Sequence, residues 1–440
     1  MADFIGNVIG GNTFFTLTDD LEFYRGSEKG KINYSGEELT GNEFLLKPHP
    51  ILFEKGISDQ ALNFFTTNNY PAFFKTSGHF PFDIFAASFY LISRYEEYLP
   101  HQKDNYGRYA HENSIAFRQN FLHLPLINIW INDFKQSLQD KFPELDNDPS
   151  MTGRKQGFTF LPTYDIDEAY SYKHKERWKN AVGLIRAFAR GEWKNLGERI
   201  RVLSGKQEDP YDAYQWMDQL HHRFQLKPYY FFILAEKPGR YDKNLRPDRK
   251  PMQELIRQHY YKYPLGIHPS WQSGDDISLI KKEKEQLARI TGGDIRSSRQ
   301  HYIRFTLPQT FRYIIEAGIE YDFSMGYGSI NGFRASVASP FYWYDLEKET
   351  VTGLLLYPFC FMDANSFFEQ KYNAEQAYRE MKHYYETVKA VNGMLITIWH
   401  NNFLGTFKNY PGWREAYERF IMESTGQAPS GSNMAAAGIL

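Results

Sequence analysis

Residues 158–168 read F-T-F-L-P-T-Y-D-I-D-E, a short apolar run that ends in acidic residues. An apolar run of this length, bounded by polar residues, is typical of a strand that is buried on both faces of a sheet. Similar runs recur further along the chain and predict strands at residues 229–234, 265–268, 301–305, 319–323, 354–361 and 394–399. This series decides the fold class, because helical patterns lie between the runs.

Helical segments separate these predicted strands. Apolar residues recur three or four positions apart at residues 213–224, 276–291, 306–318 and 374–391, which is the spacing of one helix face. Pro308 stands at the start of the third of these segments and Gly318 at its end, as expected of helix boundaries. Strands and helices that alternate over about 260 residues predict an α/β domain with a parallel sheet, either open or closed into a barrel.

The N-terminal part has a different pattern. Residues 1 to about 75 read as short strands and turns, and helical spacing follows at residues 82–98 and 124–142. A polar stretch with Pro and Gly at residues 144–157 is the best domain boundary. We therefore expect a smaller α+β domain at residues 1–150, a second domain at 156–424, and a disordered tail of small and polar residues at 425–440.

The composition excludes several classes of protein. The 440 residues carry a formal net charge of -2, so no overall basic surface is available for nucleic acid. The single cysteine, Cys360, cannot form an intrachain disulfide or hold a cysteine-ligated metal, which leaves His, Asp and Glu as ligands. No apolar run reaches the roughly 18 residues of a membrane span, and the N-terminus lacks the pattern of a signal peptide. We expect a soluble, cytoplasmic protein.

Reactive residue types follow the predicted strands. Asp165 and Asp167 end the first run, His268 ends the third, and further candidates are Arg299, His301 and His400. Loops at the carboxyl ends of parallel strands converge on one point, so these side chains are expected to share a site. Alternation along an extended segment points Asp165 and Asp167 the same way, which suits one metal ligand and one base. Taken singly, each also has a structural reading as a turn residue or a polar cap.

In this order the residues resemble the motifs of the polysaccharide deacetylase family, in a divergent bacterial subgroup with an N-terminal accessory domain. The resemblance covers roughly residues 156–423. T-Y-D-I-D at residues 163–167 is similar to the first motif, which implies Asp165 as the base and Asp167 as a metal ligand. G-I-H at residues 266–268 is similar to the opening of the second motif and implies His268 as a ligand, whereas Gln272 stands where the family has a second His.

The later motifs are also matched in part. R-Q-H-Y at residues 299–302 resembles Arg-x-Pro-Tyr, which implies that Arg299 holds the base and that the Tyr302 backbone amide donates to an oxyanion. His301 replaces the proline, and we expect it to supply the missing imidazole, with Gln272 as the alternative third ligand. I-T-I-W-H at residues 396–400 resembles the last motif, which implies that His400 protonates the leaving nitrogen. Substrate contacts are expected at Trp271, Tyr327 and Arg334.

The resemblance implies a distorted parallel (β/α) barrel and a metal-dependent carbohydrate deacetylase. A divalent metal, which the resemblance implies is zinc, would polarise an N-acetyl carbonyl of a sugar, glycan or glycan precursor. Two rivals stay open: an amide hydrolase for a substrate that is not a sugar, and a non-catalytic glycan-binding or assembly protein. A glycosidase with Asp165 and Asp167 as its carboxylate pair is disfavoured. The two carboxylates of a glycosidase are about 5 Å or more apart, whereas two residues one apart on a strand lie closer together.

One segment has no counterpart in these motifs. Residues 173–206 contain ten Lys or Arg and three Glu, with Trp178 and Trp193 among them. The segment could contact an anionic glycan, a lipid-linked diphosphate sugar or a membrane surface. A solvated helix face is the simpler reading of the same charges.

Overall fold

The computed structural model describes residues 1–9, 15–147, 157–237 and 239–425. The predicted domain boundary at 144–157 falls mostly outside these residues, as does the tail predicted at 425–440. Division into two domains at residue 150 therefore stays a prediction.

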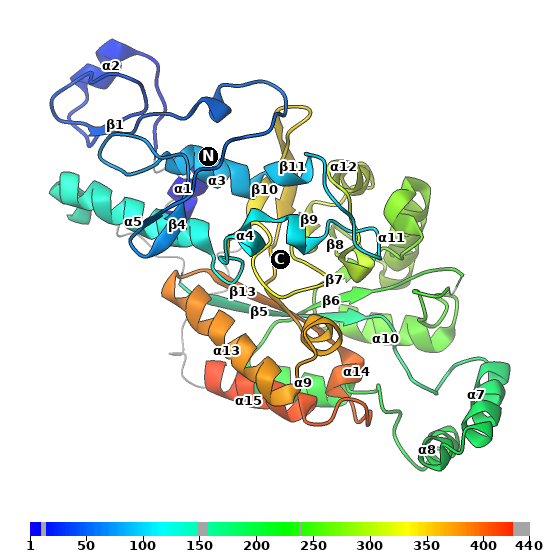
Figure 1. The fold of residues 1–440 in the computed structure, drawn as a ribbon. Helices are drawn as coiled ribbons and strands as arrows, with labels where there is room; N and C mark the ends of the chain where they lie inside the picture. The colour runs from blue at the N-terminus through cyan, green and yellow to red at the C-terminus, as the bar shows by residue number, and fades with distance from the viewer. Residues whose placement is uncertain (10–14, 148–156, 238, 426–440) are drawn as a thin grey trace.

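The chain forms a mixed α/β structure around a nine-stranded, largely parallel sheet (Figure 1). The strands follow the order β10, β11, β9, β8, β7, β6, β5, β13, β12. Their bounds are β5 Thr159–Ile166, β6 Tyr229–Phe232, β7 Leu265–Ile267, β8 Ser297–Ser298, β9 Tyr321–Asp322, β10 Phe341–Asp345, β11 Thr350–Leu356, β12 Phe361–Met362 and β13 Met394–His400. All neighbours from β11 to β12 run parallel, and β10 pairs antiparallel with β11.

Helices follow the strands of the sheet along the chain. They are α7 Arg177–Ala189, α8 Trp193–Leu203, α9 Tyr214–Phe224, α10 Lys250–Tyr260, α11 Ile277–Thr291, α12 Gln309–Glu316, α13 Ala374–Ala390, α14 Asn401–Leu404 and α15 Trp413–Thr425. Among them, α11, α12 and α13 contact β7, β11 and β13 directly. In the described residues the hydrogen-bonded order ends at β10 on one side and β12 on the other, so closure into a barrel stays a prediction.

The strand predictions hold with two exceptions, residues 301–305 and 354–361. The segment 301–305 was expected to be a strand but forms a 3-10 turn at His301–Ile303, preceded by the two-residue strand β8. Tyr302 in this turn has the left-handed angles φ 59° and ψ 11°, which no strand residue adopts. The apolar run 354–361 is divided between β11 and β12. Cys360, which lies in that run, is buried in the core as expected.

The N-terminal part combines short helices and short strands. Its elements are α1 Ala2–Ile9, α2 Leu21–Gly26, β1 Ile32–Asn33, β2 Phe44–Leu45, β3 Phe65–Thr67, β4 Tyr70–Ala72, α3 Ile84–Ile92, α4 Ile115–Arg118 and α5 Leu126–Lys141. One continuous hydrophobic cluster includes residues from these elements and from the large sheet. The N-terminal part therefore shares a hydrophobic core with the part of the chain that forms the sheet.

A buried ion network joins the two parts. Glu97 accepts hydrogen bonds from Arg334 at 2.8 and 2.5 Å and from Arg94 at 2.7 Å. Burial acts to raise the pKa of Glu97, but Arg334 and Arg94 lower it to about 2. The charged end of the N-terminal helical segment thus docks onto the part of the chain that forms the sheet. No helix in the described part of the chain has both the length and the apolar character needed to cross a membrane.

Candidate active site

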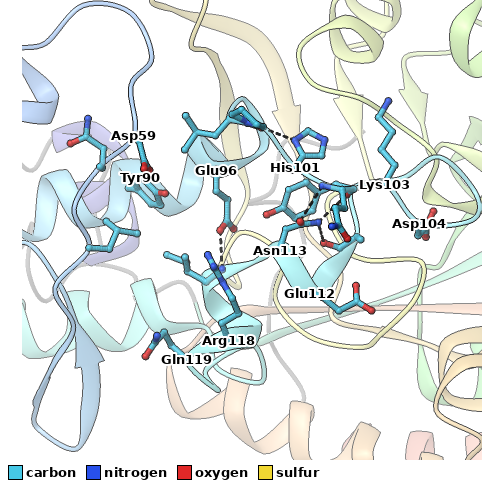
Figure 2. Close-up of a pocket in the computed structure, with 18 of the residues that line it drawn as sticks. Asp59, Tyr90, Glu96, His101, Lys103, Asp104, Glu112, Asn113, Arg118 and Gln119 are labelled. Carbon is cyan, nitrogen blue, oxygen red and sulfur yellow. Dashed lines mark hydrogen bonds between the residues drawn. The ribbon is translucent and has the colours of Figure 1, made fainter.

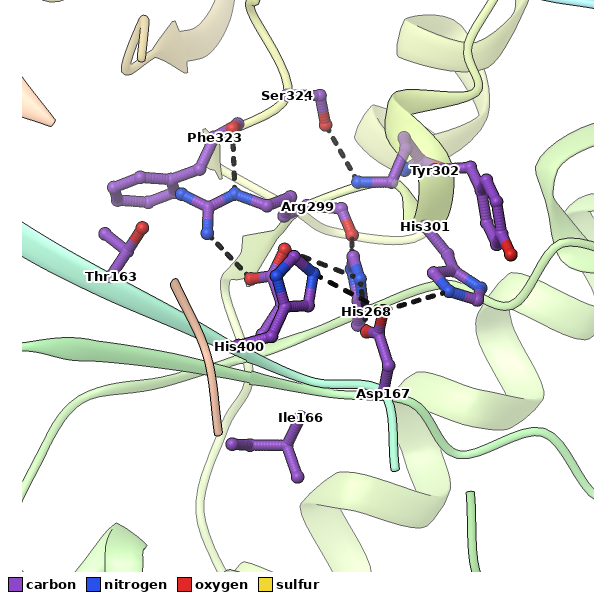
Figure 3. A network of polar contacts seen from close by, with 12 residues as sticks. Thr163, Ile166, Asp167, His268, Arg299, His301, Tyr302, Phe323, Ser324 and His400 are labelled. Carbon is purple, nitrogen blue, oxygen red and sulfur yellow. Dashed lines mark hydrogen bonds and ion pairs between the residues drawn. The ribbon is translucent and has the colours of Figure 1, made fainter. Parts of the chain in front are cut away.

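Polar side chains gather at the carboxyl-terminal edge of the sheet (Figure 3). Asp165 lies near the end of β5 and Asp167 directly beyond it, while His268 follows β7, Arg299 follows β8 and His400 ends β13. These strands are close neighbours in the sheet and run parallel, so their carboxyl ends meet at one edge. The structure therefore brings together six of the residues singled out from the sequence, with His301 as the sixth.

Asp167 lies at the centre of this group. Its Oδ1 is 3.2 Å from Nε2 of His268, and its Oδ2 is 3.4 Å from Nε2 of both His301 and His400. Burial acts to raise the pKa of Asp167, but His301 and His400 hold it well below its ordinary range. The side chain of Asp167 is 33% exposed, so the group is open to solvent on one side.

Each of the three imidazoles is oriented by a partner behind it. Nδ1 of His268 contacts the Arg299 carbonyl. Nδ1 of His301 is 2.9 Å from Asp242, and Nδ1 of His400 is 2.6 Å from Asp363. An acceptor at Nδ1 fixes the proton there and leaves Nε2 free to face the centre. This is the arrangement that metal-binding histidines have in proteins, where the outer partner sets the tautomer.

The residues fit a divalent cation. Ligand atoms of Asp167, His268 and His301 all lie within 4.8 Å of one another, and a carboxylate with two imidazoles is a donor set that zinc accepts. Oδ1 of Asp167 is buried without a hydrogen-bond partner among the described residues, as expected of an atom that awaits a cation. Gln272, the alternative third ligand, is exposed and donates to the Lys237 carbonyl at 3.4 Å.

Protonation of His301 competes with such a cation. Burial acts to lower the pKa of His301, but Asp167 and Asp242 raise it to about 9. A cation bound between Asp167 and His301 would displace this proton, because only a neutral imidazole is a ligand. Affinity for the cation is therefore expected to increase with pH up to about 9.

A second carboxylate lies beside the centre. Asp165 accepts a hydrogen bond from Arg299 at 2.7 Å, and its other oxygen is 3.6 Å from Nε2 of His268. Arg299 is fully buried, donates to the Phe323 carbonyl at 3.0 Å and stacks over the ring of Phe231. A guanidinium held in this way fixes the direction of the Asp165 carboxylate. This is the geometry expected of an oriented general base.

His400 lies on the other side of Asp167. Both carboxylate oxygens of Asp363 contact it, one at the ring and one at the backbone N–H at 2.7 Å. Burial acts to lower the pKa of His400, but Asp363 and Asp167 raise it well above its ordinary value. A ring that keeps its proton at neutral pH and faces an open centre can act as a general acid.

An aromatic cluster borders the site. Trp271 stacks on Tyr241 with ring centroids 4.1 Å apart, and Tyr302 lies 5.3 Å from Tyr106 and 4.6 Å from the ring of His301. The four aromatic side chains are partly exposed. Tyr106 comes from the N-terminal part, and the neighbouring Arg108 donates to the Tyr302 carbonyl at 2.9 Å. The N-terminal part therefore contributes to the wall of the site.

Two predicted substrate contacts do not reach this site. Tyr327 and Arg334 are each 1% exposed. Arg334 pairs with Glu97 and donates to the Gly326 carbonyl at 3.0 Å, and the Tyr327 hydroxyl accepts from Arg94 at 3.3 Å. Since no ligand can contact them in this conformation, we correct the expectation: they join the two parts of the chain and do not bind substrate. Trp271 remains a candidate for substrate binding.

Four residues of the site were missed from the sequence: Asp242, Asp363, Tyr106 and Tyr241. Asp363 directly follows β12, so the pattern of an acid after an apolar run could have found it. Tyr106 lies in a loop of the N-terminal part, and Tyr241 and Asp242 lie far along the loop after β6, so only the folded chain brings them to the site. Each acts on a residue that the sequence did indicate, either by orienting an imidazole or by packing against Trp271 or Tyr302.

A separate cavity of about 1230 Å³ lies within the N-terminal part (Figure 2). Its lining comes from residues 59–64, 90–105 and 109–119, including Glu96, His101 and Arg118. Asp104 lines this cavity and pairs with Arg108, which reaches Tyr302. The loop that carries Asp104 and Arg108 therefore contacts both the cavity and Tyr302.

Comparisons with known proteins give one family match and several distant structural likenesses. Residues 2–143 match a family of unknown function (DUF7033), and no curated protein matches the chain. A Mycobacterium smegmatis protein assigned as a polysaccharide deacetylase is similar at 15% identity and TM-score 0.40, over 62% of this chain and 86% of that one. An allantoinase is similar at 13% identity and TM-score 0.38, over 61% and 84%.

A Pseudomonas aeruginosa PAO1 protein, also assigned as a polysaccharide deacetylase, shows 14% identity and TM-score 0.38, over 60% of this chain and 84% of that chain. Because these TM-scores are 0.40 or lower, we base the function on the side chains of the site and not on these likenesses.

Proposed function

We propose that the protein is a metal-dependent amide hydrolase that removes N-acetyl groups from an N-acetylated sugar, glycan or glycan precursor. One observation carries the proposal: Asp167 is faced by three imidazoles, each oriented from behind, with the Arg299-held carboxylate of Asp165 beside it. The set combines ligands for a cation, a base and an acid within one edge of the sheet. The sequence motifs of the polysaccharide deacetylase family, on a (β/α) barrel, support the same reaction class.

Each side chain has a role in this proposal. Asp167, His268 and His301 would hold the cation, expected to be zinc, and a cation there supplies Lewis-acid activation of the amide carbonyl and of water. Asp165 accepts the proton of the attacking water, and Arg299 holds its carboxylate in position for that proton. The Tyr302 backbone amide donates to the developing oxyanion. His400, protonated and supported by Asp363, delivers a proton to the leaving nitrogen.

The aromatic cluster favours a sugar over a small linear amide. Trp271, Tyr241, Tyr302 and Tyr106 present partly exposed rings beside the reacting groups. Flat aromatic faces stack on the apolar faces of sugar rings, and a small amide has no such face to cover. An N-acetylated glycan is therefore the substrate class that uses both the metal side and the aromatic side of the site. We also propose that the protein acts in the cytoplasm.

Metal content and acetate release test the proposal together. The wild-type protein should contain about one divalent metal per chain by mass spectrometry and release acetate from N-acetylated sugar oligomers. Asp167→Ala, His268→Ala and His301→Ala should lose both, whereas Gln272→Ala should keep both, because Gln272 points away to Lys237. Metal without acetate release would favour the non-sugar amide hydrolase. Absence of metal even after reconstitution would favour the non-catalytic glycan-binding protein.

A further inference from the structure

A helical hairpin projects from the sheet domain directly after the strand that carries Asp165. It consists of α7 and α8, which lie at the periphery of the molecule, apart from the helices that cover the sheet (Figure 1). Of the seventeen large apolar side chains that are exposed in the described residues, seven lie between residues 178 and 203. This concentration in a short segment is unlike the scattered exposure that is normal for a protein surface.

The exposed apolar residues form one continuous face. Trp178, Val182, Ile185 and Phe188 recur at helical spacing along α7, and Trp193 and Ile200 face them from α8, all between 47% and 68% exposed. Ile185, Phe188 and Ile200, with Leu184 and Leu196, line an apolar cavity of about 340 Å³ between the two helices. Phe188 and Trp193 are in edge-to-face contact at 5.4 Å. We use the name hairpin face for the six exposed residues Trp178, Val182, Ile185, Phe188, Trp193 and Ile200.

The opposite side of the hairpin is firmly attached. Asp209 accepts from the backbone N–H groups of Ser171 and Tyr172, each at 2.7 Å, at the base of α7. Glu198 of α8 is buried, pairs with Lys408 at 3.1 Å and accepts from the Tyr172 hydroxyl at 3.1 Å. The hairpin therefore holds one orientation relative to the sheet domain and presents its apolar face outward.

Strong positive charge surrounds the hairpin face. Residues 173–206 contain ten Lys or Arg and three Glu, a net charge of +7 against -2 for the whole chain. Arg177, Arg186, Arg190 and Lys194 are exposed and form no ion pair with any residue that the structure describes. Because these cations are unpaired in the described part of the chain, they are available to a negatively charged surface.

We propose that the hairpin face binds the surface of a membrane that contains anionic lipids. An amphipathic helix with Trp and Phe on one face and Lys and Arg around it is the residue set of helices that lie in the headgroup region. The apolar side chains enter the boundary of the acyl chains, and the unpaired cations attract anionic headgroups. A second copy of the chain is a poor occupant, since it would bring a charge of +7 against the same charge.

Membrane binding would also orient the site. The hairpin follows Asp167 in the chain, and Lys175 at its base pairs with Glu168, the residue next to Asp167. The hairpin therefore leaves the sheet at the same edge as the proposed active site. Attached through the hairpin face, the protein would hold this edge near the bilayer, within reach of an N-acetylated sugar that is linked to a lipid. The binding itself does not depend on the proposed hydrolysis and is measured without it.

Co-sedimentation with lipid vesicles tests this inference on the full chain. The wild-type protein should bind vesicles of phosphatidylglycerol and phosphatidylcholine, bind pure phosphatidylcholine vesicles much less, and lose binding at high salt. Ile185→Glu/Phe188→Glu should weaken binding about tenfold or more, since it places charges in the inserted face. The matched control Tyr342→Glu/Val351→Glu changes equally exposed side chains on β10 and β11 and should bind like the wild type.

Arg186→Gln/Arg190→Gln/Lys194→Gln should weaken binding and flatten its dependence on salt. All substituted residues are exposed, and matching circular dichroism spectra establish that each variant is folded. The inference is overturned if the wild type does not bind anionic vesicles, or if the hairpin variant binds as the control does. Self-association that Ile185→Glu/Phe188→Glu abolishes would overturn it as well, because a second copy would then cover the face.

Discussion

Asp363→Asn gives the sharpest test of the role of His400. In the structure, one oxygen of Asp363 accepts from the ring Nδ1 at 2.6 Å and the other from the backbone N–H at 2.7 Å. An asparagine has one oxygen, so either the ring or the backbone N–H then faces an NH2 group. If the ring faces the NH2 group, the proton moves to Nε2 of a neutral imidazole. His400 would keep its place and lose its ability to stay protonated.

The magnitude follows from this loss. A positioned general acid contributes about 100- to 10,000-fold to a rate, and an Asp→Asn change behind a catalytic histidine costs up to about 10,000-fold in a serine protease. We expect kcat/KM for acetate release to fall within this range in Asp363→Asn. The residual activity should also change its pH profile. The carboxylate raises the pKa of His400, and without it the alkaline limb, where His400 loses its proton, moves to lower pH.

Metal content separates this role from a structural one. Asp363→Asn should keep its metal, because Asp363 contacts none of the three proposed ligands. Asp322→Asn is the matched control: Asp322 is equally buried at the end of β9 and bonds Ser298 and Ser324. It should leave the alkaline limb in place. An unchanged rate and profile in Asp363→Asn would refute the reasoning, and loss of metal would show that His400 is a ligand and not an acid.

Four further outcomes are expected. Arg299→Met should lower kcat/KM about 100-fold or more at unchanged metal content, because Asp165 loses its orienting partner; loss of metal instead would contradict this. Tyr106→Ala should raise KM for sugar oligomers several-fold and change kcat little. An equal fall in kcat/KM for oligomers and for monosaccharides would argue against stacking. Chelation should abolish acetate release, and zinc should restore it. Glu97→Gln should destabilise the fold by about 3 kcal/mol in urea unfolding at neutral pH. Because the pKa of Glu97 is lowered from 4.5 to about 2, its ion pairs stabilise the fold fully above pH 4.5, and this contribution is lost as the pH falls toward 2. The variant lacks this contribution, so it should lose less stability on acidification than the wild type.

Much of the site could be predicted because its residues follow strands. Asp165, Asp167, His268 and His400 each stand at the end of an apolar run, and parallel strands bring their ends to one edge. The local pattern of the sequence carries that information. It also indicates which residue types can bind a metal, so the ligand set Asp167, His268 and His301 could be proposed before the structure.

The remaining features depend on contacts between distant residues. Glu97 and Arg334 are 237 positions apart, and nothing near Arg334 in the sequence indicates that its charge is neutralised inside the protein. Arg334 therefore looked like a substrate contact. Residues 301–305 have the apolar and aromatic content of a strand, but the left-handed Tyr302 and Ile303 end it. Non-glycine residues in this region cost about 1–3 kcal/mol each and persist where the surroundings fix them. Sequence patterns do not report such tertiary constraints.

The position of His301 bears on whether the divergent motifs indicate a lost activity. With Gln272 in place of a histidine, the loop after β7 supplies one imidazole, and this alone would favour a protein without a metal. The loop after β8 supplies the other: the turn at Tyr302 and Ile303 places His301 with Nε2 3.4 Å from Asp167, and Asp242 orients its ring. A histidine that had merely replaced a proline would not need a buried carboxylate behind it. The contacts of His301 are therefore those expected of the third ligand in the proposed site, and they make Gln272 unnecessary there.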